Sequence, residues 1–244
     1  MRAFINKLFL IALSGLMLLI NSPALADSNS KSPEIIKTST NIIKQHQKIS
    51  RESAVKVIGL EGGHGSGAYV KLNGQYFVIT AKHVVGRDWL FLIEGSNKEE
   101  SVVGQVIYRS PTKDIALLRV PRLKNRKPAK LQETEQKDMA IGEELVYSGY
   151  PSSYELLTSS GIVSGYENWG ESVLVQGWAW PGSSGSAVFD ENGNVVGLVI
   201  AIGLEKFRGS AQLIETLVYV VTIDKEEMKA IKKMNVNNVD MLKN

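Results

Sequence analysis

Short apolar runs separated by turn signals constrain the fold of this 244-residue chain more than any other feature. The runs are rich in Val, Ile, Leu and Tyr and are bounded by Gly, Asn, Asp or Pro, which is typical of β-strands. Asn73-Gly74 joins two such runs directly, and this dipeptide is a strong signal of a tight hairpin turn. The pattern therefore predicts a chain built mainly from antiparallel strands.

The predicted strands fall into two sets of about six, and no long helical pattern interrupts either set. The first set comprises residues 54–58, 67–72, 75–80, 89–93, 101–109 and 115–120, and the second comprises residues 144–149, 156–164, 172–176, 186–190, 195–202 and 217–223. A small barrel closes a set of this size without leaving an unpaired edge. We expect an all-β fold of two six-stranded antiparallel β-barrels, with short N- and C-terminal helices.

The first 26 residues have the pattern of a secretory signal peptide. Arg2 and Lys7 supply positive charge, an apolar run extends from Leu8 to Ile20, and small residues end the segment at Ala24-Leu25-Ala26. The apolar run is shorter than the roughly 20 residues of a membrane-spanning helix. We expect cleavage after Ala26, export to the periplasm or the extracellular space, and no stable membrane insertion afterwards. An uncleaved anchor is the alternative.

Changes in composition set the expected domain boundaries. We expect a signal peptide at 1–26, a partly helical N-terminal extension at 27–52, a first barrel at 53–122, a linker at 123–130, a second barrel at 131–224, and a C-terminal helix and tail at 225–244. In the extension, the helix is expected to begin at Ser32 and to carry His46 on its surface. Asp224 is expected to cap the C-terminal helix, with Glu227 completing a capping box. The linker region is basic; a solvated connection is favoured over an anion-binding segment.

Composition excludes several classes of function. The chain has no cysteine, which excludes disulfides, thiolate metal sites and a cysteine nucleophile. Its 28 basic and 25 acidic residues give a net charge of +3, too small to indicate a nucleic-acid partner. No metal-binding or dinucleotide motif is present, so we expect neither a metal nor an organic cofactor. Any imidazole chemistry must use His46, His64 or His83.

Three segments carry residues suited to nucleophilic catalysis. Gly182 and Gly185 bracket Ser184 directly before an apolar strand, a layout that presents a hydroxyl on a tight turn beside backbone N–H groups. His83 follows one strongly apolar strand and Asp114 precedes another. A serine nucleophile needs a base and a group that orients the base, and these two side chains supply both.

The same segments resemble those of the trypsin/chymotrypsin-fold serine peptidases, above all the cysteine-free bacterial members that are HtrA/DegP-like or glutamyl-endopeptidase-like. The resemblance covers residues 53–224 and rests on five segments in order: Gly65–Gly67, Ile79–Val85, Asp114–Leu118, Ser159–Ser164 and Pro181–Ser186. It implies a chymotrypsin-like double barrel that hydrolyses polypeptides through an acyl-enzyme. It also implies that Ser184 is the nucleophile, His83 the general base and then acid, and Asp114 the carboxylate that orients His83. The backbone N–H groups of Gly182 and Ser184 would form the oxyanion hole.

The sequence departs from the family pattern around the expected substrate pocket. Trp178 stands where family members that cleave after Lys or Arg have an aspartate, and no histidine follows Ser184. We expect an apolar or shallow pocket that favours small or aliphatic side chains and is formed by Trp178, Val199, Ile200, Ala201 and Ile202. HtrA-like members usually carry a peptide-binding PDZ domain after the protease domain, and we expect none in residues 225–244.

Three interpretations compete with parts of this assignment. The chain could be a binding module on a chymotrypsin fold with vestigial catalysis, or a latent peptidase in which residues 27–50 pack over the cleft or mediate assembly. His64 lies in the glycine-rich segment Glu61–Gly67, but no Gly-Lys-Ser/Thr follows, so a phosphate loop is not supported. We expect His64 near the cleft, on the leaving-group side. The sequence makes no prediction of oligomeric state.

Overall fold

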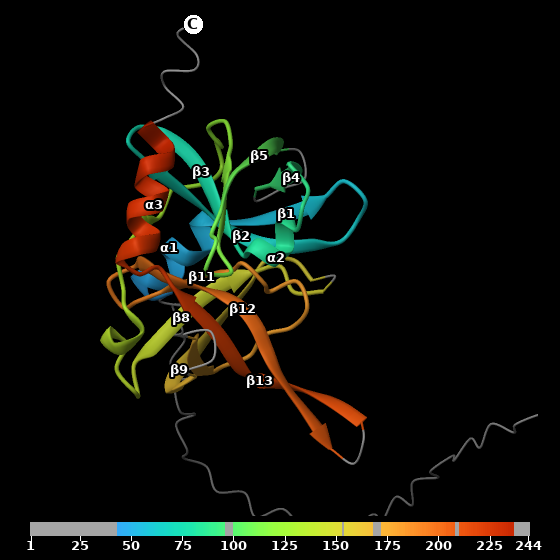
Figure 1. Cartoon of the computed structure of the whole chain (residues 1–244), viewed down its shortest axis with the longest axis vertical. Coiled ribbons are helices and arrows are strands. Elements are labelled where there is room, and N and C mark those ends of the chain that lie inside the picture. The colour runs from blue at the N-terminus through green and yellow to red at the C-terminus, as the bar shows by residue number, and fades with distance from the viewer. Residues whose placement is uncertain (1–42, 96–99, 153, 168–171, 208–209, 237–244) are drawn as a thin grey trace, which may run out of the picture. The chain divides into compact units, whose positions relative to one another are not determined.

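Two β-barrels make up most of the computed structural model, which describes residues 43–95, 100–152, 154–167, 172–207 and 210–236 (Figure 1). The predicted signal peptide and most of the predicted N-terminal extension lie outside the described residues. None of the described helices is both long and apolar enough to cross a membrane.

Six strands close the first barrel in the order β1-β2-β3-β6-β5-β4. They are β1 (Ala54–Gly59), β2 (His64–Leu72), β3 (Gln75–Thr80), β4 (Leu90–Glu94), β5 (Ser101–Arg109) and β6 (Ala116–Arg119). Every neighbouring pair is antiparallel. Alternate side chains point inward and fill the barrel, among them Val57, Tyr69, Val78 and Leu118.

The second barrel is a ring of six strands in the order β11-β8-β9-β10-β13-β12, closed by pairing of β12 with β11. They are β8 (Glu144–Gly149), β9 (Leu157–Glu167), β10 (Ser172–Gln176), β11 (Ala187–Phe189), β12 (Asn194–Phe207) and β13 (Ser210–Thr222). A short strand, β7 (Lys130–Leu131), pairs with β12 in parallel outside this ring. The predicted fold of two six-stranded antiparallel barrels is therefore confirmed.

The hairpin of β12 and β13 is longer than the sequence pattern predicted. Pairing continues to Phe207 and Ser210, and the hairpin extends away from the barrel body (Figure 1). Register shifts interrupt the ladder between Val199 and Ala201 and again between Ile202 and Gly203. Because these irregularities break the alternation of apolar and polar residues, the pattern stopped short of the real strand ends.

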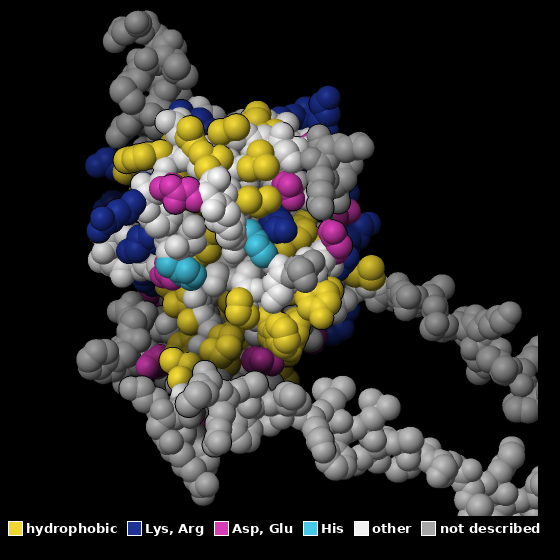
Figure 2. All heavy atoms as spheres, turned by 90° about the vertical axis from the view of Figure 1, so that its right-hand side faces the viewer, with side chains coloured by type: hydrophobic (Ala, Val, Ile, Leu, Met, Phe, Trp, Pro, Cys, Tyr) yellow, Lys and Arg dark blue, Asp and Glu magenta, His cyan; other side chains and the backbone are white. Residues whose placement is uncertain are grey.

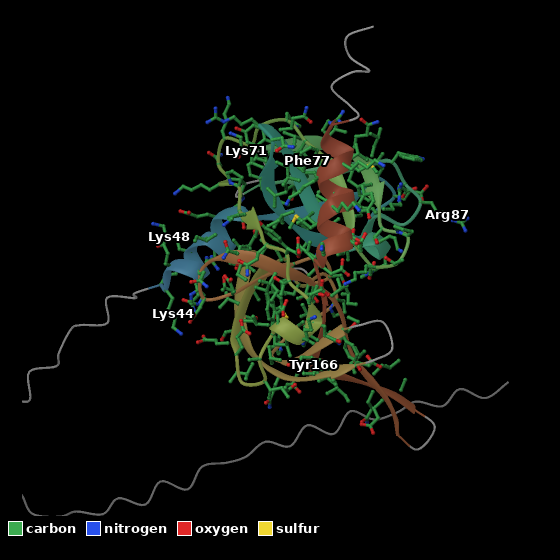
Figure 3. The ribbon with its side chains drawn as sticks, turned by 60° about the vertical axis from the view of Figure 1, so that its left-hand side comes forward. Lys44, Lys48, Lys71, Phe77, Arg87 and Tyr166 are labelled. Atoms are coloured by element: carbon green, nitrogen blue, oxygen red, sulfur yellow. The ribbon has the colours of Figure 1, made fainter. Side chains whose placement is uncertain are left out.

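Short helices flank the barrels. α1 (Gln45–Ser53) includes His46 but begins at Gln45; residues 43 and 44 are not helical, so the helix predicted from Ser32 does not continue unbroken to His46. α1 also extends beyond His46 to the start of the first barrel, while α2 (Lys82–Val85) and η1 (Gln136–Asp138) each make a single turn. α1 lies on the second barrel, where Ser50 Oγ donates a hydrogen bond to Ser148 Oγ at 2.7 Å; Lys44 and Lys48 mark this helix in Figure 3.

The C-terminal helix α3 (Lys225–Val236) forms where the sequence predicted it. Asp224 caps it, since Asp224 Oδ1 accepts the Glu227 N–H at 2.8 Å. Glu227 does not return a hydrogen bond to the cap as a capping box requires: its Oε2 atom accepts from Ser110 Oγ instead. The apolar face of α3 packs beside Phe77 of the first barrel (Figure 3).

One apolar core lies between the two barrels and holds them together. It combines Phe77, Ile79 and Leu117 from the first barrel with Phe189, Leu198 and Val221 from the second. All six side chains are buried. Strands β3, β6 and β11 all contribute side chains to this core. The core therefore fixes the candidate catalytic segments that adjoin these strands relative to one another.

Candidate active site

His83 and Asp114 are joined by two hydrogen bonds in the first barrel. His83 lies on the single turn α2, directly after the buried strand β3. Its Nδ1 atom is 2.6 Å from Asp114 Oδ2, and its backbone N–H donates to Asp114 Oδ1 at 2.8 Å. A carboxylate acceptor at Nδ1 places the ring proton there and leaves Nε2 as the acceptor. Figure 2 shows histidine side chains exposed on one face of the molecule.

Asp114 is held in its ionised form. Its partial burial opposes ionisation, but the two hydrogen bonds from His83 and the nearby charges of His83 and Lys82 outweigh burial and keep the Asp114 pKa below its ordinary value. An ionised Asp114 both fixes the orientation of the ring and favours a positive charge on it. This is the electrostatic arrangement that a histidine general base requires.

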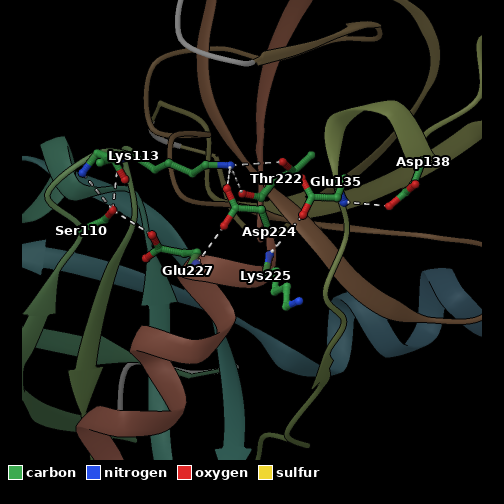
Figure 4. A network of polar contacts seen from close by, with 9 residues as sticks. Ser110, Lys113, Glu135, Asp138, Thr222, Asp224, Lys225 and Glu227 are labelled. Carbon is green, nitrogen blue, oxygen red and sulfur yellow. Dashed lines mark hydrogen bonds and ion pairs between the residues drawn. The ribbon is translucent and has the colours of Figure 1, made fainter.

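The loop that carries Asp114 is anchored to α3 (Figure 4). Ser110 Oγ accepts the Lys113 N–H at 3.0 Å and donates to Glu227 Oε2 at 2.8 Å. Lys113 Nζ lies 2.6 Å from Asp224 Oδ2, and both side chains are largely buried. Asp224, just before α3, and Glu227, in its first turn, therefore both hold this loop. Together they fix the segment just before Asp114.

Ser184 lies on a tight turn before β11 that depends on glycine. Gly182 and Gly185 have φ angles of 97° and 86°, a region that side chains rarely adopt. A Cβ atom on Gly185 would also lie 2.2 Å from Ser66 O and from Thr80 Oγ1. No larger residue fits here, because the Ser184 turn packs directly against the first barrel.

The peptide bond before Gly182 is oriented by its neighbours. Pro181 O accepts the Ser152 N–H at 2.6 Å, and the peptide bond is trans. Its N–H group, that of Gly182, therefore points away from Ser152. On the other side of the same residue, Gly182 O accepts from Ser66 Oγ at 2.8 Å.

The peptide bond before Ser184 is oriented in the same way. Ser183 O accepts the Ser186 N–H at 2.9 Å, which directs the Ser184 N–H to the opposite side. Within the described part of the chain, neither the Gly182 nor the Ser184 N–H donates a hydrogen bond. Two fixed donors without acceptors beside a serine hydroxyl are the elements of an oxyanion hole.

A cavity of about 260 Å³ brings the two halves of the site together. His83, Ser184 and Gly182 all line it, and so does His64. Among the described residues, no hydrogen bond joins Ser184 Oγ to His83 Nε2. The structure thus places the predicted nucleophile and base on one cavity without a hydrogen bond between them. Catalytic hydrogen bonds are often long or absent when no substrate is bound.

His64 lies next to the Ser184 turn. Its Nε2 atom is 2.8 Å from Tyr150 O and therefore carries the proton of this hydrogen bond. The same atom is 2.9 Å from where a Cβ atom on Gly182 would stand. His64 contacts the wall of the cavity, whereas His46 lies on α1 and does not line it.

A second cavity of about 190 Å³ adjoins Ser184. It is lined by Ala179, Trp180, Pro181, Ser183, Ser184, Val199, Ala201, Ile202 and Leu213. Of the five residues predicted from sequence to form a substrate pocket, Val199, Ala201 and Ile202 are in this wall. Trp178 and Ile200 are not.

The two displaced residues have other contacts. Ile200 packs against the core between the barrels. The backbone N–H of Trp178 donates to Tyr147 Oη, and its backbone O accepts from the same hydroxyl. Its ring lies 5.6 Å from the ring of Trp180, at an angle of 32°, and Trp180 lines the cavity in its place.

Sequence reasoning did not identify several residues that shape this site. Ser66 and Ser152 hold the Ser184 turn by hydrogen bonds, and Leu213 extends the apolar cavity. Ser66 stood in a segment that carried the family resemblance, but its hydrogen bonds depend on contacts between barrels that the sequence does not display. In the described residues, no three His, Asp or Glu side chains are grouped as a metal site would need.

Comparison with known protein families and curated proteins agrees with this geometry. The family model described as a trypsin-like peptidase domain matches residues 65–198. The chain is 27% identical over 153 residues to a serine protease HtrA-like protein of Staphylococcus haemolyticus, covering 55% of this chain and 24% of that protein. It is 29% identical over 140 residues to a probable periplasmic serine endoprotease DegP-like protein of Pseudomonas putida, covering 55% and 28%. The chain spans about a quarter of the length of these relatives.

Solved structures share the double-barrel fold. An inactive form of Rv3671c from M. tuberculosis H37Rv superposes with a TM-score of 0.60 at 19% identity, covering 81% of this chain and 94% of that one. The HtrA-type protease AlgW with a tripeptide superposes with a TM-score of 0.62 at 18% identity, covering 78% and 63%. These structures agree in fold, and the family model covers more than half of the sequence. The chain therefore belongs to the trypsin-like peptidase domain family.

Proposed function

We propose that this protein is a serine endopeptidase in which Ser184, His83 and Asp114 form the catalytic triad. The observation that carries the proposal is a single cavity lined by Ser184 and by the His83 ring whose Nδ1 atom is bonded to Asp114. Two N–H donors of the Ser184 turn are oriented and without acceptors in the described residues. A binding module would not need this combination of base, orienting carboxylate and oxyanion donors.

The proposed reaction follows from these groups. Ser184 Oγ attacks the carbonyl carbon of the substrate and gives its proton to His83 Nε2, while Asp114 stabilises the resulting imidazolium. The Gly182 and Ser184 N–H groups bind the oxyanion. His83 then protonates the departing amine, and water hydrolyses the acyl-enzyme by the same route. Because a protonated His83 cannot accept the Ser184 proton, activity is expected to fall on acidification.

The substrate class is polypeptide, with a small or aliphatic residue before the cleaved bond. The cavity beside Ser184 is walled mainly by apolar side chains, and no described charged side chain lines it. A charged side chain bound there would lose its hydration without gaining a partner. The AlgW structure, which shares the fold, was solved with a tripeptide. Cleavage profiling in which charged residues dominate before the cut would contradict this preference.

Export through the N-terminal signal peptide completes the proposal. The charged start, apolar run and Ala24-Leu25-Ala26 ending support it, and one relative is named a probable periplasmic endoprotease. The expected product begins at Asp27, which mass spectrometry of the protein recovered from a secreting host would show. Recovery of the uncleaved chain in the membrane fraction would support an anchor instead.

Labelling by a fluorophosphonate, which reacts with activated serines, tests the catalytic assignment. The wild-type protein should be labelled, and Ser184→Ala and His83→Ala should not. His46→Ala is the matched control, since it removes a histidine from α1 that does not line the cavity. A folded wild-type protein that is never labelled, or a His83→Ala variant labelled at the wild-type rate, would overturn the proposed function.

A further inference from the structure

A third cavity lies apart from Ser184 and is strongly basic. Its volume is about 570 Å³, larger than either cavity at the candidate active site. It is formed by the end of α1, by the basic segment after the first barrel and by the loop after β8, through Arg51, Glu52, Lys124, Asn125, Arg126, Lys127, Tyr150, Glu155 and Leu156. We call it the linker cavity.

Arg126 is the most unusual group in the linker cavity. Its side chain is buried, with the residue only 8% exposed. One terminal nitrogen donates to Arg51 O at 2.9 Å and the other to Tyr150 Oη at 3.2 Å, while the buried Nε atom has no hydrogen-bond partner. In the described part of the chain, no carboxylate forms an ion pair with Arg126. A buried guanidinium with only neutral partners carries a large desolvation cost.

Arg51 adds a second positive charge with neutral partners. Its guanidinium donates to Thr158 Oγ1 at 2.7 Å and to Leu156 O at 3.4 Å. Burial lowers the pKa of Arg126, and repulsion from Arg51 lowers it further. Two guanidinium groups are therefore held near one another although they repel.

Three carboxylates lie in or beside the linker cavity, those of Glu52, Glu100 and Glu155. Glu52 Oε1 pairs with Lys127 Nζ at 3.0 Å. The Glu100 carboxylate accepts the backbone N–H groups of Lys124 and Asn125. The charge of Glu100 favours the charged form of Arg126 and partly offsets the effect of its burial on the pKa. None of these three carboxylates forms an ion pair with Arg126 in the described residues, so its charge is not directly paired.

We propose that the linker cavity binds a small oxyanion, a phosphate or carboxylate group, with Arg126 as its buried anchor. A guanidinium presents parallel N–H donors that match the oxygens of such groups. Only two of the five N–H groups of Arg126 donate to Arg51 O and Tyr150 Oη, so each terminal nitrogen keeps a second N–H. The exposed Lys124 lines the same cavity. A bound oxyanion supplies a negative charge that no described carboxylate places within ion-pair distance of Arg126. This site is independent of the proposed peptidase activity.

Binding is tested by thermal unfolding and calorimetry of the purified protein with added inorganic phosphate or acetate. Sodium chloride keeps the ionic strength constant, so that general screening does not contribute. The wild-type protein should show a saturable rise in melting temperature. Arg126→Gln should abolish it, and Lys124→Ala should weaken the apparent affinity about five- to tenfold. Saturation by either ion supports the site and identifies the group it prefers.

Arg122→Ala is the matched control. Arg122 is an exposed basic residue of the same segment that does not line the cavity, so its removal should leave the affinity unchanged. If Arg126→Gln does not fold, comparing the ion affinity of Lys124→Ala with that of Arg122→Ala still tests the proposal. The proposal is overturned if neither ion gives a saturable effect on the wild-type protein, or if Arg122→Ala weakens binding as much as Lys124→Ala.

Discussion

At the scale of single residues, Ser66 links the first barrel to the Ser184 turn. It is fully buried; its N–H donates to Ser184 O at 2.8 Å, and its hydroxyl accepts from Tyr150 N and donates to Gly182 O. Ser66→Ala leaves two buried polar groups unpaired, at a cost of about 1–3 kcal/mol each. Because Gly182 would lose an orienting contact, we expect kcat to fall about tenfold or more with a small change in KM.

Steady-state kinetics on a peptide substrate checks this prediction for Ser66. Ser164→Ala is the control, because Ser164 Oγ donates to Leu174 O on an exposed strand away from the site. An unchanged kcat in a folded Ser66→Ala protein would show that the turn keeps its shape without this hydroxyl.

Glu227 gives stability a pH dependence. Burial raises its pKa and repulsion from Asp224 adds to this, while hydrogen bonds from Ser110 and Tyr108 and the charge of Lys113 act in the opposite direction. The folded state therefore binds the Glu227 proton more tightly than the unfolded chain. This contribution is fully present below the ordinary glutamate pKa and is lost as the pH rises through the folded-state pKa.

Replacing Glu227 by glutamine should remove that dependence. Relative to the wild type, Glu227→Gln should gain about 1 kcal/mol in the free energy of unfolding between about pH 4 and pH 8. Denaturant unfolding at both pH values measures the difference, with the exposed Glu226→Gln as control. A difference between variant and wild type that stays constant with pH would show that Glu227 ionises equally well in both states.

At the scale of elements, the first turn of α3 positions the Asp114 loop. Asp224 both caps the helix and pairs with Lys113, so two substitutions separate the roles. Asp224→Asn keeps a good cap but removes the charge, and should cost about 1–3 kcal/mol of stability. Asp224→Ala should cost about 1 kcal/mol more.

The same variants should also affect catalysis. Because Lys113 precedes Asp114, both substitutions should slow fluorophosphonate labelling, measured where the variants are folded. Glu226→Gln, on the same turn, should change neither stability nor labelling. Normal labelling of both Asp224 variants would mean that the loop holds Asp114 without α3.

The β12–β13 hairpin should set the depth of the cavity beside Ser184. Leu213 lines this cavity, and its cross-strand partner Leu204 does not. Leu213→Ala should widen the cavity and shift cleavage toward larger apolar residues, by about tenfold in relative kcat/KM. Leu204→Ala is the control, and the cleavage preference of both variants is measured on a peptide library. If the Leu213→Ala profile is identical to that of the Leu204→Ala control, Leu213 is not part of the substrate pocket.

The sequence predicted elements better than contacts between them. The twelve barrel strands, the Asn73-Gly74 hairpin and the C-terminal helix follow from local patterns and are present in the structure, although β12 and β13 extend beyond their predicted ends and β7 was not predicted. The family resemblance predicted Trp178 and Ile200 in the pocket wall, but a ring contact with Trp180 and an irregularity in β12 direct them elsewhere. The basic cavity also could not be predicted, since it joins three segments that only the packing of the barrels brings together.

At the scale of the whole molecule, the proposed triad depends on the junction between the barrels. His83 and Asp114 come from the first barrel and Ser184 from the second, and one apolar core joins the two. Leu198→Ala in this core should cost about 2–5 kcal/mol in the free energy of unfolding. Since neither barrel can keep its share of the core alone, we expect a single unfolding transition in both proteins.

Denaturant unfolding followed by tryptophan fluorescence, circular dichroism and Ser184 labelling tests this coupling. The first barrel reports through Trp89 and the second through Trp180. All three signals should change together, and the Leu198→Ala midpoint should lie at lower denaturant; Leu204→Ala, an exposed leucine on the same strand, should leave the midpoint unchanged. Two separated transitions would mean that each barrel is stable alone. Labelling should then be lost at the first of them, because the base and the nucleophile lie on different barrels.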